Sequence, residues 1–229
     1  MNALKFAFVA CVACASTLAA RAEMSAQAWL RHYYLNPQPA EVPRMVQALS
    51  HQGYFDESAE TAVAIGFFST VFAQNPDRVD TWLAGFRSLP RNHQRLMAAA
   101  LWQAGNPRGA PMLRTLSQSS ASRTEIQQLA DLPSAPVART AVLSPSSMNL
   151  QWGAFLASGD RKYITNVLAA IGTGEPGLDE AARYALAQNA AAHPRVMEIC
   201  QAELAKQPTG AQSVLRAALE DAAKGHPQS

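Results

Sequence analysis

The sequence predicts an all-α protein, in which antiparallel pairs of helices form an irregular α-solenoid or a layered bundle. Alanine is abundant, apolar residues recur every three or four positions, and no segment alternates polar and apolar residues over the length of a strand. Short joints that contain proline separate successive helical segments, and helices joined in this way usually run antiparallel.

The start of the chain has the three regions of a secretory signal peptide. Lys5 makes the start basic, residues 6–20 carry no charge, and Ala20-Arg21-Ala22 supplies the small-x-small pattern of a signal peptidase site. We therefore expect residues 1–22 to be removed, so that the mature chain begins at Glu23. The uncharged stretch is shorter than the ~20 apolar residues of a membrane-spanning helix. The mature chain is expected to lack a transmembrane segment and to reside in the periplasm or the medium.

The cysteines leave one alternative to simple cleavage. Cys11 and Cys14 each follow small residues, which loosely suggests lipidation, although Leu is missing from the usual position three residues before either one. The mature chain keeps Cys200 alone, so it forms no internal disulfide. Since Cys200 lies on an apolar helical stripe, we expect its thiol to be buried.

Charge argues against a nucleic-acid partner. Removal of Lys5 and Arg21 takes the 19 basic residues to 17, equal to the 17 acidic residues. Proteins that bind nucleic acid depend on an excess of Lys and Arg to neutralise phosphates.

The N-terminal helical half, residues 23–118, contains six amphipathic segments. The third is expected to be capped by Asp56 or Ser58. The apolar faces of the six segments run over Trp29–Tyr34, Met45–Leu49, Val63–Phe72, Val79–Phe86, Leu96–Leu101 and Met112–Leu116.

Residues 119–145 form a Ser/Pro-rich connection with one short helix, Thr124–Leu132. If the chain has a domain boundary, it falls between Gln118 and Ser146. The C-terminal helical half, residues 146–229, then shows apolar faces over Leu150–Leu156, Ile164–Ile171, Leu178–Ala192, Val196–Leu204 and Val214–Leu219.

Three segments combine packing and turn residues: Asn75–Val79 followed by Trp82, then Ala100–Trp102, and Leu150–Asp160. In these segments the chain resembles exported proteobacterial all-helical proteins that have no assigned activity. The resemblance spans most of the mature chain and implies a helical fold and an envelope location. It implies no catalytic residue, because the shared residues are those of packing and turns.

The sequence shows no cluster of residues typical of a catalytic, metal or cofactor site. The histidines are spread one to a segment without a His-x-x-x-His pair, so no metal site is predicted. Gly172–Gly177 matches G-x-G-x-x-G, but a helical segment precedes it and Pro176 removes a donor, so we interpret it as a turn between helices. No cofactor is predicted.

Carboxylates give the main enzymatic alternative. A cell-wall hydrolase needs one carboxyl group whose pKa is raised in an apolar pocket. Glu57 and Glu60 are the candidates.

Aromatic side chains give the candidates for partner contacts. Trp82 and Trp152 share stripes with Leu and Phe and are expected in the core. Trp102 with Met97, and Tyr33 with Tyr34, are the candidate contacts.

Together these features favour a non-catalytic, exported helical scaffold that binds another envelope protein or peptide through a groove between helical layers. An immunity or inhibitor protein is one form of this hypothesis. A cell-wall hydrolase that uses a buried carboxylate and a lipid carrier with a large dry cavity are the alternatives.

Overall fold

The computed structural model describes residues 25–118, 120, 122–173, 175 and 177–225. Within these ranges the chain forms twelve α-helices and three 3-10 turns and contains no β-strand, which confirms the all-α class. The expected signal peptide, its cleavage site at Ala20, Ala22 and Glu23, and the lipidation candidate Cys14 lie outside the described residues.

The α-helices, in chain order, are α1 (Ala26–His32), α2 (Val42–His51), α3 (Ser58–Gln74), α4 (Pro76–Phe86), α5 (Arg91–Gln103), α6 (Gly109–Gln118), α7 (Arg123–Asp131), α8 (Pro145–Ser158), α9 (Arg161–Ala169), α10 (Leu178–Ala192), α11 (Pro194–Leu204) and α12 (Thr209–Ala223). The 3-10 turns are η1 (Tyr33–Leu35), η2 (Pro39–Glu41) and η3 (Val137–Arg139).

Proline and glycine set the joints as the sequence predicts. Pro76 and Pro194 each occupy the first turn of a helix, where the missing N–H costs no hydrogen bond. Residues 172, 173, 175 and 177, which the structure describes, lie between α9 and α10 and belong to no helix, as expected of a turn between helices. The capping prediction for α3 is wrong, because the residue before the helix is Glu57 and no side chain caps it. The Asp56 carboxylate instead accepts hydrogen bonds from Asn92 and His93.

Helices α3 and α8 make the most extensive helix–helix contact in the described chain, although they lie far apart in sequence. Their backbones approach closely at two glycines. A Cβ atom on Gly66 would lie 2.0 Å from the Leu150 carbonyl oxygen, and one on Gly153 would lie 1.9 Å from that of Val63. Because the side chains at a contact set the distance between helix axes, only glycine permits this approach. Contact between such distant helices favours the bundle over the solenoid.

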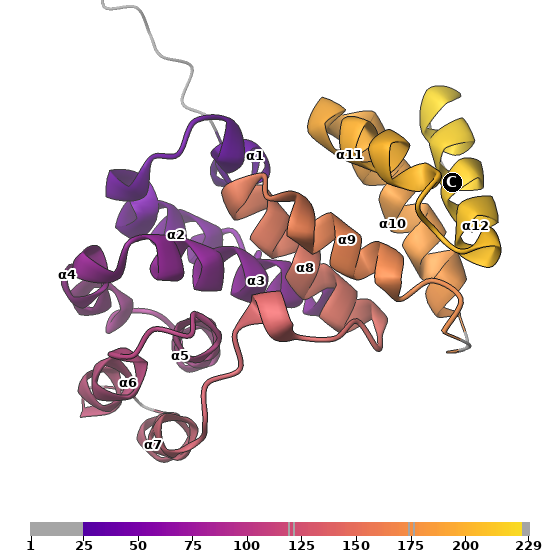
Figure 1. Ribbon diagram of the computed structural model, residues 1–229. Coiled ribbons are helices and arrows are strands. Elements are labelled where there is room, and N and C mark those ends of the chain that lie inside the picture. The colour runs from indigo at the N-terminus through magenta and orange to yellow at the C-terminus, as the bar shows by residue number, and fades with distance from the viewer. Residues whose placement is uncertain (1–24, 119, 121, 174, 176, 226–229) are drawn as a thin grey trace, which may run out of the picture.

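The other helices surround this pair. Figure 1 shows α5, α6 and α7 at one end of the molecule and α10, α11 and α12 at the other, with α3, α8 and α9 between them. One hydrophobic core runs through all of these layers, from Ala26 to Ala222. It includes Trp82 and Trp152, each 3% exposed, and Cys200, which is fully buried, as the sequence predicts.

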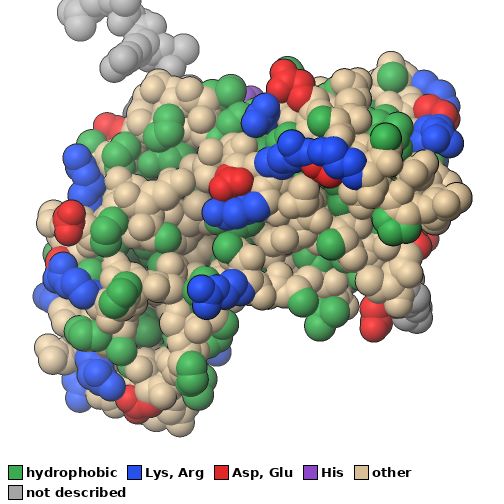
Figure 2. Space-filling model, viewed as in Figure 1, with side chains coloured by type: hydrophobic (Ala, Val, Ile, Leu, Met, Phe, Trp, Pro, Cys, Tyr) green, Lys and Arg blue, Asp and Glu red, His purple; other side chains and the backbone are tan. Residues whose placement is uncertain are grey.

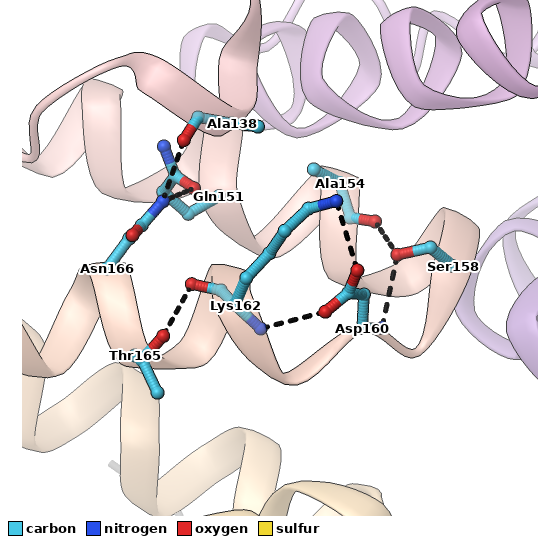
Figure 3. Close-up of polar contacts among 8 residues, drawn as sticks. All are labelled: Ala138, Gln151, Ala154, Ser158, Asp160, Lys162, Thr165 and Asn166. Carbon is cyan, nitrogen blue, oxygen red and sulfur yellow. Dashed lines mark hydrogen bonds and ion pairs between the residues drawn. The ribbon is translucent and has the colours of Figure 1, made fainter.

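The 119–145 connection is attached to α8 by Gln151. The connection contains α7 and η3. The buried Gln151 side-chain amide donates hydrogen bonds to the carbonyls of Val137 and Thr140, both at 3.0 Å. It also accepts one from Asn166 of α9 at 3.0 Å, and Figure 3 shows the two side chains pointing toward each other. These polar groups satisfy one another and hold η3, α8 and α9 together.

Helices α10, α11 and α12 pack mainly on one another, and α10 and α11 also contact α8 and α9. At the α9–α11 contact, Glu203 is 7% exposed and pairs with Arg161 and Lys206. Figure 2 shows acidic side chains beside basic ones over this part of the surface. Among the described helices, none is long and apolar enough to cross a membrane.

Candidate functional site

A groove of about 660 Å³ lies between α10 on one side and α1, α3 and α8 on the other. We call it the α8–α10 groove. From α8 it is lined by Pro145, Met148, Asn149, Trp152 and Leu156. From α10 it is lined by Ala181, Tyr184, Ala185, Gln188, Asn189 and Ala192.

The spacing of these residues explains why they share one surface. On each helix they recur at intervals of three or four, so they form a single face. Each set spans eleven residue steps, which at 1.5 Å per residue makes the groove about 16 Å long. On α10 this face consists of three alanines, two side-chain amides and Tyr184, which is 60% exposed.

The floor of the groove is apolar. Leu30, Met148 and Leu156 are buried in the core, and Val63 is partly buried against it. Trp152 is also 3% exposed, but its indole Nε1 has no hydrogen-bond partner among the described residues. Buried donors are nearly always paired, so this indole is a polar group that the fold leaves unsatisfied.

Three side-chain amides stand along the two walls. Asn189 uses its Nδ2 to donate to the Ala185 carbonyl at 2.8 Å, which leaves its Oδ1 without a partner in the described chain. Asn149 Nδ2 lies 3.5 Å from the Ala59 carbonyl, at the limit of a hydrogen bond. Gln188 forms no hydrogen bond with any described residue. The walls therefore offer both donors and acceptors to an occupant.

His193, between α10 and α11, lines the groove and also contacts Tyr34 of η1. The ring of His193 lies 5.9 Å from that of His32, and its Nδ1 lies 3.4 Å from the Tyr34 hydroxyl. Burial lowers the pKa of His193 to about 4, helped by the nearby His32 and Arg31, so the ring is neutral at pH 7. The sequence, with its histidines one to a segment, gave no sign of this pair.

One basic and one acidic residue line the groove, Arg31 and Glu60. Neither forms an ion pair with a described residue, and both lie close enough to Tyr54 to influence its hydroxyl. Burial and the Glu60 charge raise the pKa of Tyr54. With His193 neutral, the lining carries no net charge at pH 7.

Two of the four predicted partner contacts are not on the surface, which corrects the expectation drawn from the sequence. Met97 is 1% exposed and Tyr33 is 2% exposed, because both side chains point into the core. Tyr34 is half-buried and packs on Phe155, with the ring centroids 5.2 Å apart. None of the four lines the α8–α10 groove.

Trp102, the fourth predicted contact, is half-buried beside a smaller pocket of about 230 Å³. Its Nε1 donates to the Leu132 carbonyl at 3.4 Å, and its own carbonyl accepts a hydrogen bond from Ser134. The indole is therefore engaged with the connection after α7.

The candidate hydrolase carboxylates do not lie in an apolar pocket. Glu57 is exposed, and Glu60 is partly exposed at the edge of the groove. Glu60 is the single acidic residue in the described lining, whereas glycoside hydrolysis ordinarily uses two carboxylates that flank the scissile bond.

No three His, Cys, Asp or Glu side chains of the described residues are grouped closely enough to hold a metal ion. Comparison with protein-family models, with curated proteins and with solved structures gives no match.

Proposed function

We propose that this chain is an exported, non-catalytic helical protein that binds another protein or a peptide of the cell envelope in the α8–α10 groove. The observation that carries the proposal is the combination of an apolar floor with polar groups that have no partner in the fold. The amide of Gln188 and the Oδ1 of Asn189 both belong to this set. Binding sites typically combine apolar walls with a few convergent polar groups of this kind.

The residues around the groove support binding more than catalysis. The lining contains no Ser or Cys that an adjacent base could activate, and His193 makes its contacts with Tyr34, His32 and Phe155. Glu60 has no second carboxylate beside it in the described lining. An immunity or inhibitor protein that neutralises an envelope-targeted toxin is one form of this proposal.

The N-terminal sequence supports export, and the neutral charge of the mature chain supports a protein partner over nucleic acid. The full chain, produced in a Gram-negative host, is expected in the periplasmic fraction with Glu23 as its first residue.

The groove is tested by filling it. Ala185 lines the groove, so Ala185→Phe places a ring in the space that a partner would occupy. Ala191→Phe is the matched control, because Ala191 lies on the same helix, is exposed and does not line the groove. Both variants and the unaltered protein are immobilised and exposed to envelope extracts of the native host.

We expect the unaltered protein and Ala191→Phe to retain the same partner, and Ala185→Phe to lose it. Equal circular dichroism and thermal midpoints for the three proteins ensure that the loss reports on the groove. Capture by Ala185→Phe at the level of the control would contradict a partner site in the α8–α10 groove.

A further inference from the structure

We infer that the occupant of the α8–α10 groove is an extended, uncharged peptide segment of about five residues, held mainly by its main chain. This inference rests on the proposed function and specifies the chemistry of the partner. It follows from the length of the groove, the amides on its two walls and the charge of its lining.

Length gives the size of the segment. The groove is about 16 Å long, because each lining set spans eleven residue steps of a helix. An extended chain advances about 3.3 Å per residue, so about five residues fit. A helix of the same length and about 10 Å across would occupy about 1,300 Å³. That is twice the groove volume of about 660 Å³, so at most half of the volume of a helix would fit inside the groove.

The amides favour an extended chain over a helix more strongly than size does. A helix satisfies its own backbone hydrogen bonds and would present an apolar face to the groove. That face would bury the side-chain amides of Gln188 and Asn149 without partners, at a cost for each group. An extended peptide exposes N–H and C=O groups that need partners of their own, and a side-chain amide offers one donor and one acceptor in the same geometry.

The arrangement of these groups matches a peptide that lies between the walls. Asn149 stands on α8, while Gln188 and Asn189 stand on α10, so both edges of an extended segment find an amide. The apolar floor made by Met148, Leu156 and Val63 takes the side chains that point downward.

The charge of the groove lining indicates which side chains the bound peptide carries. The lining contains one Arg and one Glu, and its histidine is neutral at pH 7, so no excess charge attracts an acidic or basic segment. A segment of uncharged residues avoids the cost of burying an unpaired charge in the groove.

The test uses a library of random, unstructured seven-residue peptides selected on the folded protein recovered from the periplasm. The tightest peptide is then measured against Asn149→Leu and Gln188→Leu. Each substitution keeps a side chain of similar size and removes its donor and acceptor. We expect each to raise Kd about fivefold and the pair about twentyfold, in line with the loss of one hydrogen bond per site. Gln212→Leu on α12, which does not line the groove, is the control and is expected to leave Kd unchanged.

A second measurement leaves the protein unaltered. The selected peptide is remade with single N-methyl groups on its backbone nitrogens, which remove one N–H donor at a time. Methylation within the central five residues is expected to raise Kd tenfold or more at two or more positions, and methylation at the ends to have little effect. Methylation that leaves Kd unchanged at every position would overturn main-chain recognition.

The outcomes separate this inference from the proposed function. Tighter binding by the Leu variants, or displacement of the peptide by cell-wall saccharides alone, would overturn the inference and leave a partner groove in place. Selection of no peptide would also overturn it, and the pull-down with Ala185→Phe would then decide the proposed function by itself. A peptide that binds Ala185→Phe as well as it binds the unaltered protein would overturn the inference, because it would not occupy the groove, and the pull-down would again decide the proposed function.

Discussion

The contacts that α8 makes with α3 and with α10 differ in how completely they are packed. Toward α3, glycines bring the two backbones together and leave no space between them. Toward α10, the facing residues include Ala181, Ala185 and the amides, and a groove of about 660 Å³ remains. The face of α8 toward α3 is therefore closely packed, whereas the face toward α10 lines an open groove.

The polar groups at the two contacts differ in the same way. Near α3 and α9, the buried Gln151 amide is fully used by Val137, Thr140 and Asn166. Near α10, Trp152 lies one residue farther along the same helix and has an unpaired indole N–H. Unsatisfied buried polar groups are costly inside a protein, so the contrast between these neighbouring residues shows that the packing around α8 satisfies its polar groups unevenly.

The largest effect is expected at the glycine contact. In Gly153→Ala the new Cβ would lie 1.9 Å from the Val63 carbonyl oxygen and 2.7 Å from the Phe67 nitrogen. Since neither backbone atom moves without displacing its helix, we expect the free energy of unfolding to fall by about 3 kcal/mol or more. Urea denaturation followed by tryptophan fluorescence measures the change.

Gly210→Ala on α12 is the matched control, because a Cβ there meets nothing within 4 Å. Alanine has the higher helix propensity, so this variant is expected to be as stable as the parent or up to about 1 kcal/mol more stable. Equal stability of Gly153→Ala and the parent would show that α3 and α8 do not approach each other this closely at Gly153.

The helices were predictable from the sequence because their signals are local. Periodic apolar residues and the prolines at 76 and 194 mark where helices run and begin, and each lies within a few residues of what it determines. The cap of α3 was mispredicted because Asp56 has a competing partner, His93, that is 37 residues away and invisible in a local pattern.

The site was harder to predict because its residues meet only in the folded chain. Gly66 and Gly153 look like weak points within two helical patterns, and nothing local shows that they face each other. The sequence suggested a groove between helical layers but proposed Trp102, Met97, Tyr33 and Tyr34 as its contacts. Met97 lies beside Leu96 and Leu101 in sequence, and only the tertiary packing shows that the core also covers its side of the helix.

The second largest effect is a dependence of the free energy of unfolding on pH, caused by His193 beside the groove. The pKa of His193 is about 4 in the folded protein, below its ordinary value of 6.5. Between these values the unfolded chain binds a proton that the folded protein does not, so stability is complete above pH 6.5 and falls as the pH approaches 4. We expect a loss of about 2 kcal/mol between pH 7 and pH 4.5 in urea denaturation.

His193→Gln is expected to remove most of this pH dependence, because glutamine does not titrate. His51→Gln, at the exposed end of α2, is the control and should keep the full dependence. If His193→Gln lost as much unfolding free energy between pH 7 and pH 4.5 as the parent, the His193 ring would not cause the loss. The groove side of α8 would then be no more sensitive to acid than the contact between α3 and α8.

The smallest effect is expected at the ion pair that attaches α11 to α9. Arg161→Met leaves the buried Glu203 with Lys206, 3.4 Å away, as its remaining charged partner. Because that partner still compensates the carboxylate, we expect a loss of about 1 kcal/mol, confined to the contact between α9 and α11. Arg195→Met is the control, since Arg195 pairs with Glu198 at an exposed position.

Cys200 reports on this contact separately from the rest of the molecule. Burial raises the pKa of its thiol to about 12, so it reacts with a thiol reagent only when α11 opens. The four tryptophans all lie outside α10, α11 and α12, so their fluorescence follows the remainder of the fold. Arg161→Met is expected to speed Cys200 labelling about fivefold, as a loss of about 1 kcal/mol requires, with little change in the fluorescence midpoint. If the Cys200 labelling rate and the fluorescence midpoint changed together, helices α10 to α12 would unfold only together with α3 and α8. The open groove would then not weaken the attachment of α10 to α12 to the rest of the protein.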